Sequence, residues 1–241
     1  MKRIFVFVVG LLAATALKAQ DKIIVDPNAS VRNLNGKHFE KIEVSNAIKL
    51  IVTQGEAESI AVSANEEQYK QDIVTEISGT TLKIYSKNNN LSFSGRRNRK
   101  LTVYVSFVKL NALEASGATD VVAVGDIEQP ALKLEVSGAS TVKAALKVAE
   151  LKAELSGASK GLLTGAAGSA KIECNGASDL SAFKLNIENA FIEASGASDI
   201  TVSVTGDLRA DASGASSIRY KGNGVASKIK TSGASSISKA E

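Results

Sequence analysis

The octapeptide KAELSGAS (residues 152–159) returns nineteen residues later as KIECNGAS (residues 171–178). Its Ser/Asn-Gly-Ala centre is present seven times, with glycines at positions 117, 138, 157, 176, 196, 214 and 233. The spacings of 21, 19, 19, 20, 18 and 19 residues give a period near 20 over more than half of the chain. A period of that length predicts a solenoid in which each repeat is one coil.

The residues before each motif indicate what a coil is made of. In KAEL, Lys152 and Glu154 alternate with Ala153 and Leu155, and the other copies alternate in a similar way. A period of two predicts strands that bury one face. We therefore predict an all-β fold, a single-stranded parallel β-helix of about seven coils with an N-terminal β-rich cap.

The repeated motif is better explained as a corner of the coil than as a reactive group. Glycine adopts positive φ without a Cβ penalty, and serine bonds backbone groups at bends. Residues 157–161 match the nucleophile pattern G-x-S-x-G, but that pattern needs a following helix and a histidine base. His38 is the only histidine, and Cys174, the only cysteine, fits a core position. We predict no catalytic residue, no cofactor and no bound metal.

The chain divides into four parts. Residues 1–19 are interpreted as a signal peptide and residues 20–36 as an exposed N-terminal segment. Residues 37–110 form the predicted cap, and residues 111–241 form the β-helix repeats, continuous with the cap. Within the cap, KIEVSNA (residues 41–47) is a degenerate copy of the motif with Asn46 in the glycine position.

The N-terminal segment also affects the interpretation of charge. Lys2 and Arg3 precede an apolar run, Ile4–Leu17, which is typical of a secretory signal cleaved after Ala19. Its removal, with Lys18, takes the net charge from +4 to about +1. Near-neutrality gives no electrostatic reason to expect a nucleic-acid partner. We expect an exported protein of the periplasm or cell surface that is not an integral membrane protein after cleavage.

Two columns of opposite charge should stack along the coils. The acidic column is Glu114, Glu135, Glu154, Glu173, Glu193 and Asp211, and the basic column is Lys133, Lys152, Lys171 and Arg209. Stacked carboxylates could attract Ca²⁺, but adjacent columns of opposite charge compensate each other, which favours a solvated face. The basic run at residues 96–100 is interpreted as a solubilising loop, with contact to lipopolysaccharide, acidic glycans or anionic lipid as the alternative.

Several segments carry a family resemblance: FEKIEVSNAIKLIVTQG (39–55), LKIYSK (82–87), KLTVYVSF (100–107) and LEASGATDV (113–121). With the recurring SGAS, they resemble the head GIN domain family of auto-transporter adhesins, exported proteins common in Bacteroidetes. The resemblance extends over about residues 37–220. It implies a β-helix similar to the pectate-lyase architecture, no catalytic residues and an adhesive role.

We therefore expect a non-enzymatic envelope or surface protein, an adhesin-like module for binding or display, with a glycan, envelope or cell-surface ligand. A carbohydrate-active β-helix enzyme and an envelope sensor module are the alternatives. The repeats contain only Phe183, Phe191 and Tyr220 as aromatic residues, which disfavours an enzyme that needs platforms for sugars.

Overall fold

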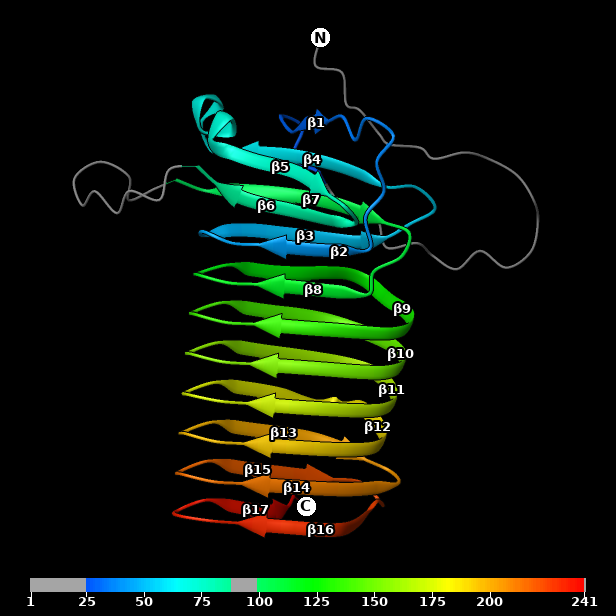
Figure 1. Cartoon of the computed structure of the whole chain (residues 1–241), viewed down its shortest axis with the longest axis vertical. Helices are drawn as coiled ribbons and strands as arrows, with labels where there is room; N and C mark the ends of the chain where they lie inside the picture. The colour runs from blue at the N-terminus through cyan, green and yellow to red at the C-terminus, as the bar shows by residue number, and fades with distance from the viewer. Residues whose placement is uncertain (1–24, 88–98, 241) are drawn as a thin grey trace, which may run out of the picture.

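Alternating apolar and polar residues place most of the chain in strands, which stack as coils along one axis (Figure 1). The computed structural model describes residues 25–87 and 99–240. Its elements are β1 (Ser30–Arg32), β2 (Lys41–Val44), β3 (Ile48–Gln54), β4 (Ser59–Ala64), η1 (Glu67–Asp72), β5 (Ile73–Ser78), β6 (Thr81–Ser86), β7 (Leu101–Phe107), β8 (Ala112–Ala115), β9 (Asp120–Val136), β10 (Thr141–Leu155), β11 (Lys160–Cys174), β12 (Asp179–Ala194), β13 (Asp199–Val204), β14 (Asp207–Ala212), β15 (Ser217–Lys221), β16 (Val225–Thr231) and β17 (Ser236–Lys239).

Each coil contributes one segment to each of two parallel sheets. The first half of β12 pairs with β13, and its second half pairs with β14, so the long strands pass from one sheet to the other. We call the sheet that contains β6, β2, β8, the second halves of β9–β12, β14 and β16 the front sheet, and its partner the back sheet. Parallel stacking of about seven coils confirms the predicted solenoid.

The core between the two sheets consists mainly of Leu, Ile, Val and Ala side chains. Along the last inward position of the front sheet, Val136, Leu155, Cys174, Ala194 and Ala212 follow one another and are all at most 2% exposed. Cys174 thus occupies the core position predicted for it, and burial raises the pKa of its thiol to about 12.

The motif glycines form the corner that the sequence predicts. Gly157, Gly176 and Gly196 have φ of 74°, 76° and 74°, and the other motif glycines lie between 72° and 80°. The amide of the alanine that follows each glycine donates to the glycine carbonyl of the preceding coil, as Ala158 does to Gly138 over 2.7 Å. Asn46, the predicted substitute for glycine, has φ of 68°.

The upstream copy of the motif is a coil of the same stack. β2 pairs in parallel with β8 on one side and with β6 on the other, although about 70 residues separate β2 from β8. The amide of Ser116 donates to the Val44 carbonyl over 2.9 Å, as in the successive downstream coils. After the β2–β3 coil, the chain therefore forms a further coil from β6 and β7, and β6 pairs with one edge of β2. The chain then continues into β8, which pairs with the other edge of β2.

The N-terminal end of the stack is covered by β1, β4, β5 and η1 (Figure 1). β1 pairs antiparallel with β4, and β5 pairs antiparallel with β6. β1 lies within residues 20–36, so the described part of that segment contributes to the cap. The η1 element is a 3-10 helix that directly precedes β5.

At the opposite end, the inward residues of the last coil reach solvent. Ile229 is 41% exposed, whereas Ala210, its register partner one coil earlier, is 3% exposed. The predicted signal peptide, residues 1–19, lies outside the described residues. Within residues 25–87 and 99–240, no helix is long and apolar enough to cross a membrane.

Candidate functional site

The second hydroxyl residue of the motif is closed to solvent in six of its seven copies, all except Ser235. Ser140 and Ser159 are 0% exposed, and Ser198 is 2% exposed. Ser198 Oγ donates to the carbonyls of Cys174 at 3.2 Å and Ser195 at 3.0 Å, and Ser140 Oγ accepts from the Thr119 amide at 3.2 Å. Ser159 Oγ has no hydrogen-bond partner within the described structure. These three serines therefore differ in their hydrogen bonds, although they occupy the same position of the motif.

No base lies beside these serines. His38 Nδ1 lies 3.2 Å from Glu58 Oε2, and its side chain is 87% exposed in the cap. Ser159 begins no helix, because β11 follows it directly. The arrangement that activates a serine nucleophile is thus missing from the described residues at the G-x-S-x-G sequence.

The front sheet carries three rows of outward side chains, in register from coil to coil. The cation row is Lys41, Lys133, Lys152, Lys171, Arg209 and Lys228, with Ala112 and Phe191 at one coil each. The carboxylate row is Glu43, Glu114, Glu135, Glu154, Glu173, Glu193 and Asp211. The hydroxyl row follows at the turn: Ser45, Ser116, Ser137, Ser156, Asn175, Ser195, Ser213 and Ser232.

The predicted compensation between the charged columns is confirmed. Lys152 Nζ lies 2.5 Å from Glu154 Oε1, and Lys171 Nζ lies 2.6 Å from Glu173 Oε1, each two residues along the same strand. These carboxylates raise the pKa of both lysines. Lys133 bonds Glu135 in the same manner, and this hydrogen bond lowers the pKa of the Glu135 carboxyl.

The carboxylate row ends in a lysine on both sides. Lys83 on β6 is opposite Glu43, and Lys230 on β16 is opposite Asp211. Lys41 at the N-terminal end serves two coils, with its Nζ 2.9 Å from Glu43 Oε1 and 2.5 Å from Glu114 Oε1. Both carboxylates raise the pKa of Lys41, Glu114 more than Glu43. The terminal lysines limit the negative charge where the row stops.

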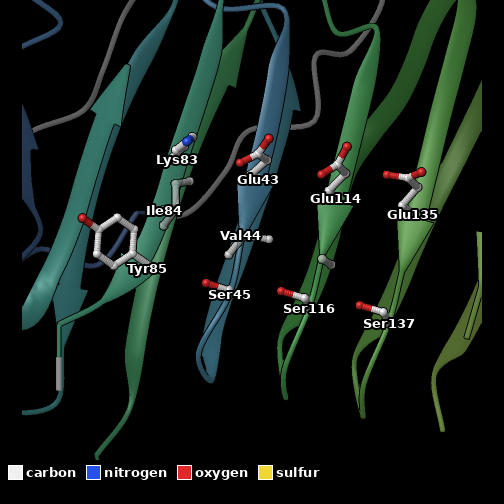
Figure 2. A pocket seen from close by; sticks show the side chains of 11 residues that line it. Glu43, Val44, Ser45, Lys83, Ile84, Tyr85, Glu114, Ser116, Glu135 and Ser137 are labelled. Carbon is white, nitrogen blue, oxygen red and sulfur yellow. The ribbon is translucent and has the colours of Figure 1, made fainter. Parts of the chain in front are cut away.

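A small pocket lies between the carboxylate and hydroxyl rows near the cap. Figure 2 shows Glu43, Glu114 and Glu135 in one line and serine hydroxyls in a second line, with Tyr85 on the neighbouring strand. The pocket encloses about 250 Å³. Across the described residues, no group of three or more His, Cys, Asp or Glu side chains is arranged to hold a metal ion.

A longer groove follows the cation row. It has a volume of about 980 Å³. Its floor includes Leu132, Leu151, Ala170 and Ala190, and one wall is the cation row from Lys133 to Lys228. The other wall consists of corner residues where each coil leaves the back sheet: Ala131, Glu150, Ser169, Asn189 and Asp207.

The described end of the basic run at residues 96–100 is partly structural. Arg99 Nη1 lies 3.0 Å from Asp72 Oδ2, and the Arg99 side chain is 9% exposed. The Arg99 guanidinium also lies 5.7 Å from the ring centroid of Tyr69. Arg99 therefore stabilises the cap through its contacts with Asp72 and Tyr69. Its predicted place in a solubilising loop was wrong. Residues 96–98 lie outside the described part.

With this geometry in place, comparison with known proteins identifies the family. The model of the family described as "putative auto-transporter adhesin, head GIN domain" matches residues 38–224. The chain belongs to the head GIN domain family. The resemblance stated from the sequence is thereby confirmed. No match was found among the curated proteins.

Solved structures share the fold of this head GIN domain. A "putative adhesin" from Bacteroides fragilis is 21% identical, with a TM-score of 0.80, over 88% of this chain and 97% of the other. A "putative adhesin" from Parabacteroides distasonis is 16% identical, with a TM-score of 0.70, over 88% and 97%. A "putative lipid binding protein" from the same species is 20% identical, with a TM-score of 0.63, over 89% and 97%.

Sequence reasoning located the charged columns of the head GIN domain but missed the groove beside them. One feature of the sequence could have indicated this groove. At the position of Lys171 in the repeat, the next copy has Phe191, an exposed aromatic residue in a row of cations. The sequence did not indicate that alternation breaks at the corner, where Ala149 and Glu150 are both exposed and Glu150 lines the groove.

Proposed function

We propose that this chain is an exported, non-enzymatic, adhesin-like module that binds a ligand or displays a surface at the cell envelope. One observation carries the proposal: the second hydroxyl of the motif is buried in most copies, while the first motif serine and the charged side chains of each coil are partly or fully exposed on the front sheet. A rigid face with the same groups on every coil is suited to binding rather than to turnover. The family description and the names of the structural relatives support the same class of function.

The proposal is tested with purified, fluorescently labelled protein on a glycan array and on intact bacterial and epithelial cells. The expected result is saturable binding to at least one glycan or cell type, without release of reducing ends from the bound polysaccharides. Turnover of a polysaccharide would favour the carbohydrate-active enzyme instead. No saturable binding on any surface would contradict the binding module.

A further inference from the structure

We infer that the groove along the cation row binds a linear acidic polysaccharide, extended parallel to the solenoid axis. This inference rests on the proposed binding function and names its ligand class and its site. The residues that carry it are Lys171, Phe191, Arg209 and Lys228, which lie on four consecutive coils.

The shape of the groove requires an extended ligand. Its wall residues are in register on successive coils, so the groove runs across the strands and along the stack. Neighbouring coils are about 4.8 Å apart, and each coil offers one wall residue from the cation row and one from the corner. A repeating chain can place equivalent groups against equivalent coils, whereas a compact molecule would contact only one or two of them.

The charge of the groove favours an acidic chain. Its lining contains five cations, Lys133, Lys152, Lys171, Arg209 and Lys228, and only two carboxylates, Glu150 and Asp207. The carboxylate row lies two residues farther along each strand and does not line the groove. A lysine ammonium has three N–H donors, and the ion pair to Glu154 or Glu173 occupies only part of that capacity. The remaining donors are free for a ligand carboxylate or sulfate.

The positive character is strongest at the C-terminal end of the groove. Within the described residues, neither Lys228 nor Lys230 forms an ion pair, and Lys230 takes the place that a carboxylate has in the preceding coils. Arg209 of the cation row pairs with Asp207 of the corner wall, with Nε 3.1 Å from Oδ2, so this ion pair joins the two walls at one coil. A guanidinium keeps further donors in a planar fork that suits a carboxylate.

Phe191 indicates a sugar rather than a simple polyanion. Its side chain replaces a cation in the row and is 38% exposed, and Lys171 Nζ lies 5.8 Å from its ring centroid. An exposed ring beside hydrogen-bonding side chains such as Asn189 can hold the apolar face of one sugar unit. A single-stranded nucleic acid would need aromatic platforms for successive bases, and Phe191 is the only aromatic residue in this lining.

The test compares two triple variants of the purified chain. The groove variant is Lys171→Gln, Arg209→Gln and Lys228→Gln. The matched control is Lys143→Gln, Lys160→Gln and Lys184→Gln, which removes the same charge from exposed positions of the back sheet. Binding is measured by biolayer interferometry to polygalacturonate, to dextran as a neutral chain, and to phosphatidylglycerol vesicles and oligo(dT) as anions of other classes.

We expect saturable binding to polygalacturonate that weakens about tenfold or more in the groove variant and less than about twofold in the control. Phe191→Ala should weaken binding to polygalacturonate while leaving its salt dependence unchanged, because it removes no charge. Preference for vesicles or oligo(dT), or equal losses in both triple variants, would overturn the inference. Binding to neutral glycans or to cells that the groove variant retains would also overturn it, while the proposed function would stand.

Discussion

A Cβ atom on Gly176 would lie 2.7 Å from the carbonyl oxygen of Gly157 in the preceding coil. Adjacent copies of the motif are therefore in backbone contact, and the same relationship recurs along the stack, for example between Gly196 and Gly176 at 2.5 Å. Glycine is required at this position for two reasons: the backbone has a positive φ, and there is no space for a side chain. This explains why it remains while the serine before it changes to Asn175.

Gly176→Ala should therefore destabilise the protein more than the same change at an open corner. Gly79 is the matched control, since it has φ of +60° and nothing within 4 Å of its Cβ position. We expect Gly79→Ala to cost about 1 kcal/mol from φ alone, and Gly176→Ala to cost about 1–3 kcal/mol more, because backbone must move. Urea denaturation gives both values. Equal costs would mean that the coils do not stack through this glycine.

The motif serines provide a second comparison. Ser198→Ala should lose about 0.5–1.5 kcal/mol, because Ser198 Oγ donates to two carbonyls. Ser159→Ala removes a buried hydroxyl that has no partner, so stability should be unchanged or increase by up to about 1 kcal/mol. Thermal unfolding of both variants checks the difference. A loss at Ser159 as large as that at Ser198 would contradict the described hydrogen bonding.

The free energy of unfolding should decrease at acidic pH, partly because the Glu135 carboxylate becomes protonated. Its pKa is lowered in the folded protein by the hydrogen bond from Lys133. The contribution is therefore present above the unfolded pKa of a glutamate, about 4.3, and is lost as the pH falls through the folded pKa. Glu135→Gln should flatten the decline of stability with pH in that range. An unaltered pH profile of the urea midpoint would show that this ion pair contributes nothing.

Cys174 should be unreactive until the protein unfolds. It is 0% exposed, and burial raises its pKa to about 12, so almost no thiolate forms near pH 8. We expect a disulfide reagent such as Ellman's to react with one thiol per chain only in denaturant, at the rate of unfolding. Rapid labelling of the native protein would place Cys174 outside the core.

The sequence predicted the repeated parts of the structure better than the parts made once. Lys152 and Glu154 recur with a fixed period, so the cation and carboxylate rows on the front sheet followed from alternation alone. The position of the β6–β7 coil could not be predicted, because nothing in residues 81–107 specifies that it stacks on the far side of β2. Arg99 was misjudged for a related reason, since its partner Asp72 comes from a helix packed over the cap.

The groove was missed because it depends on the shape of a corner. Alternation fails where Ala149 and Glu150 are both exposed, at the bend of the strand, and Glu150 lines the groove together with Lys152. A prediction from period-two alternation assigns each residue to one of two faces of a regular strand, and therefore does not predict a bend within the strand. Only the three-dimensional path of the strand brings Glu150 and Lys152 to opposite sides of Leu151.

The central claim is that the repeated motif builds the scaffold and leaves ligand binding to the outward rows. Its most direct test is to treat the native protein with a fluorophosphonate that reacts with activated serines, and to quantify the labelling by mass spectrometry. Because Ser159 is 0% exposed and no histidine lies beside it, the predicted result is no labelling at any motif serine. Stoichiometric labelling of Ser159 alone, abolished in Ser159→Ala, would contradict the account.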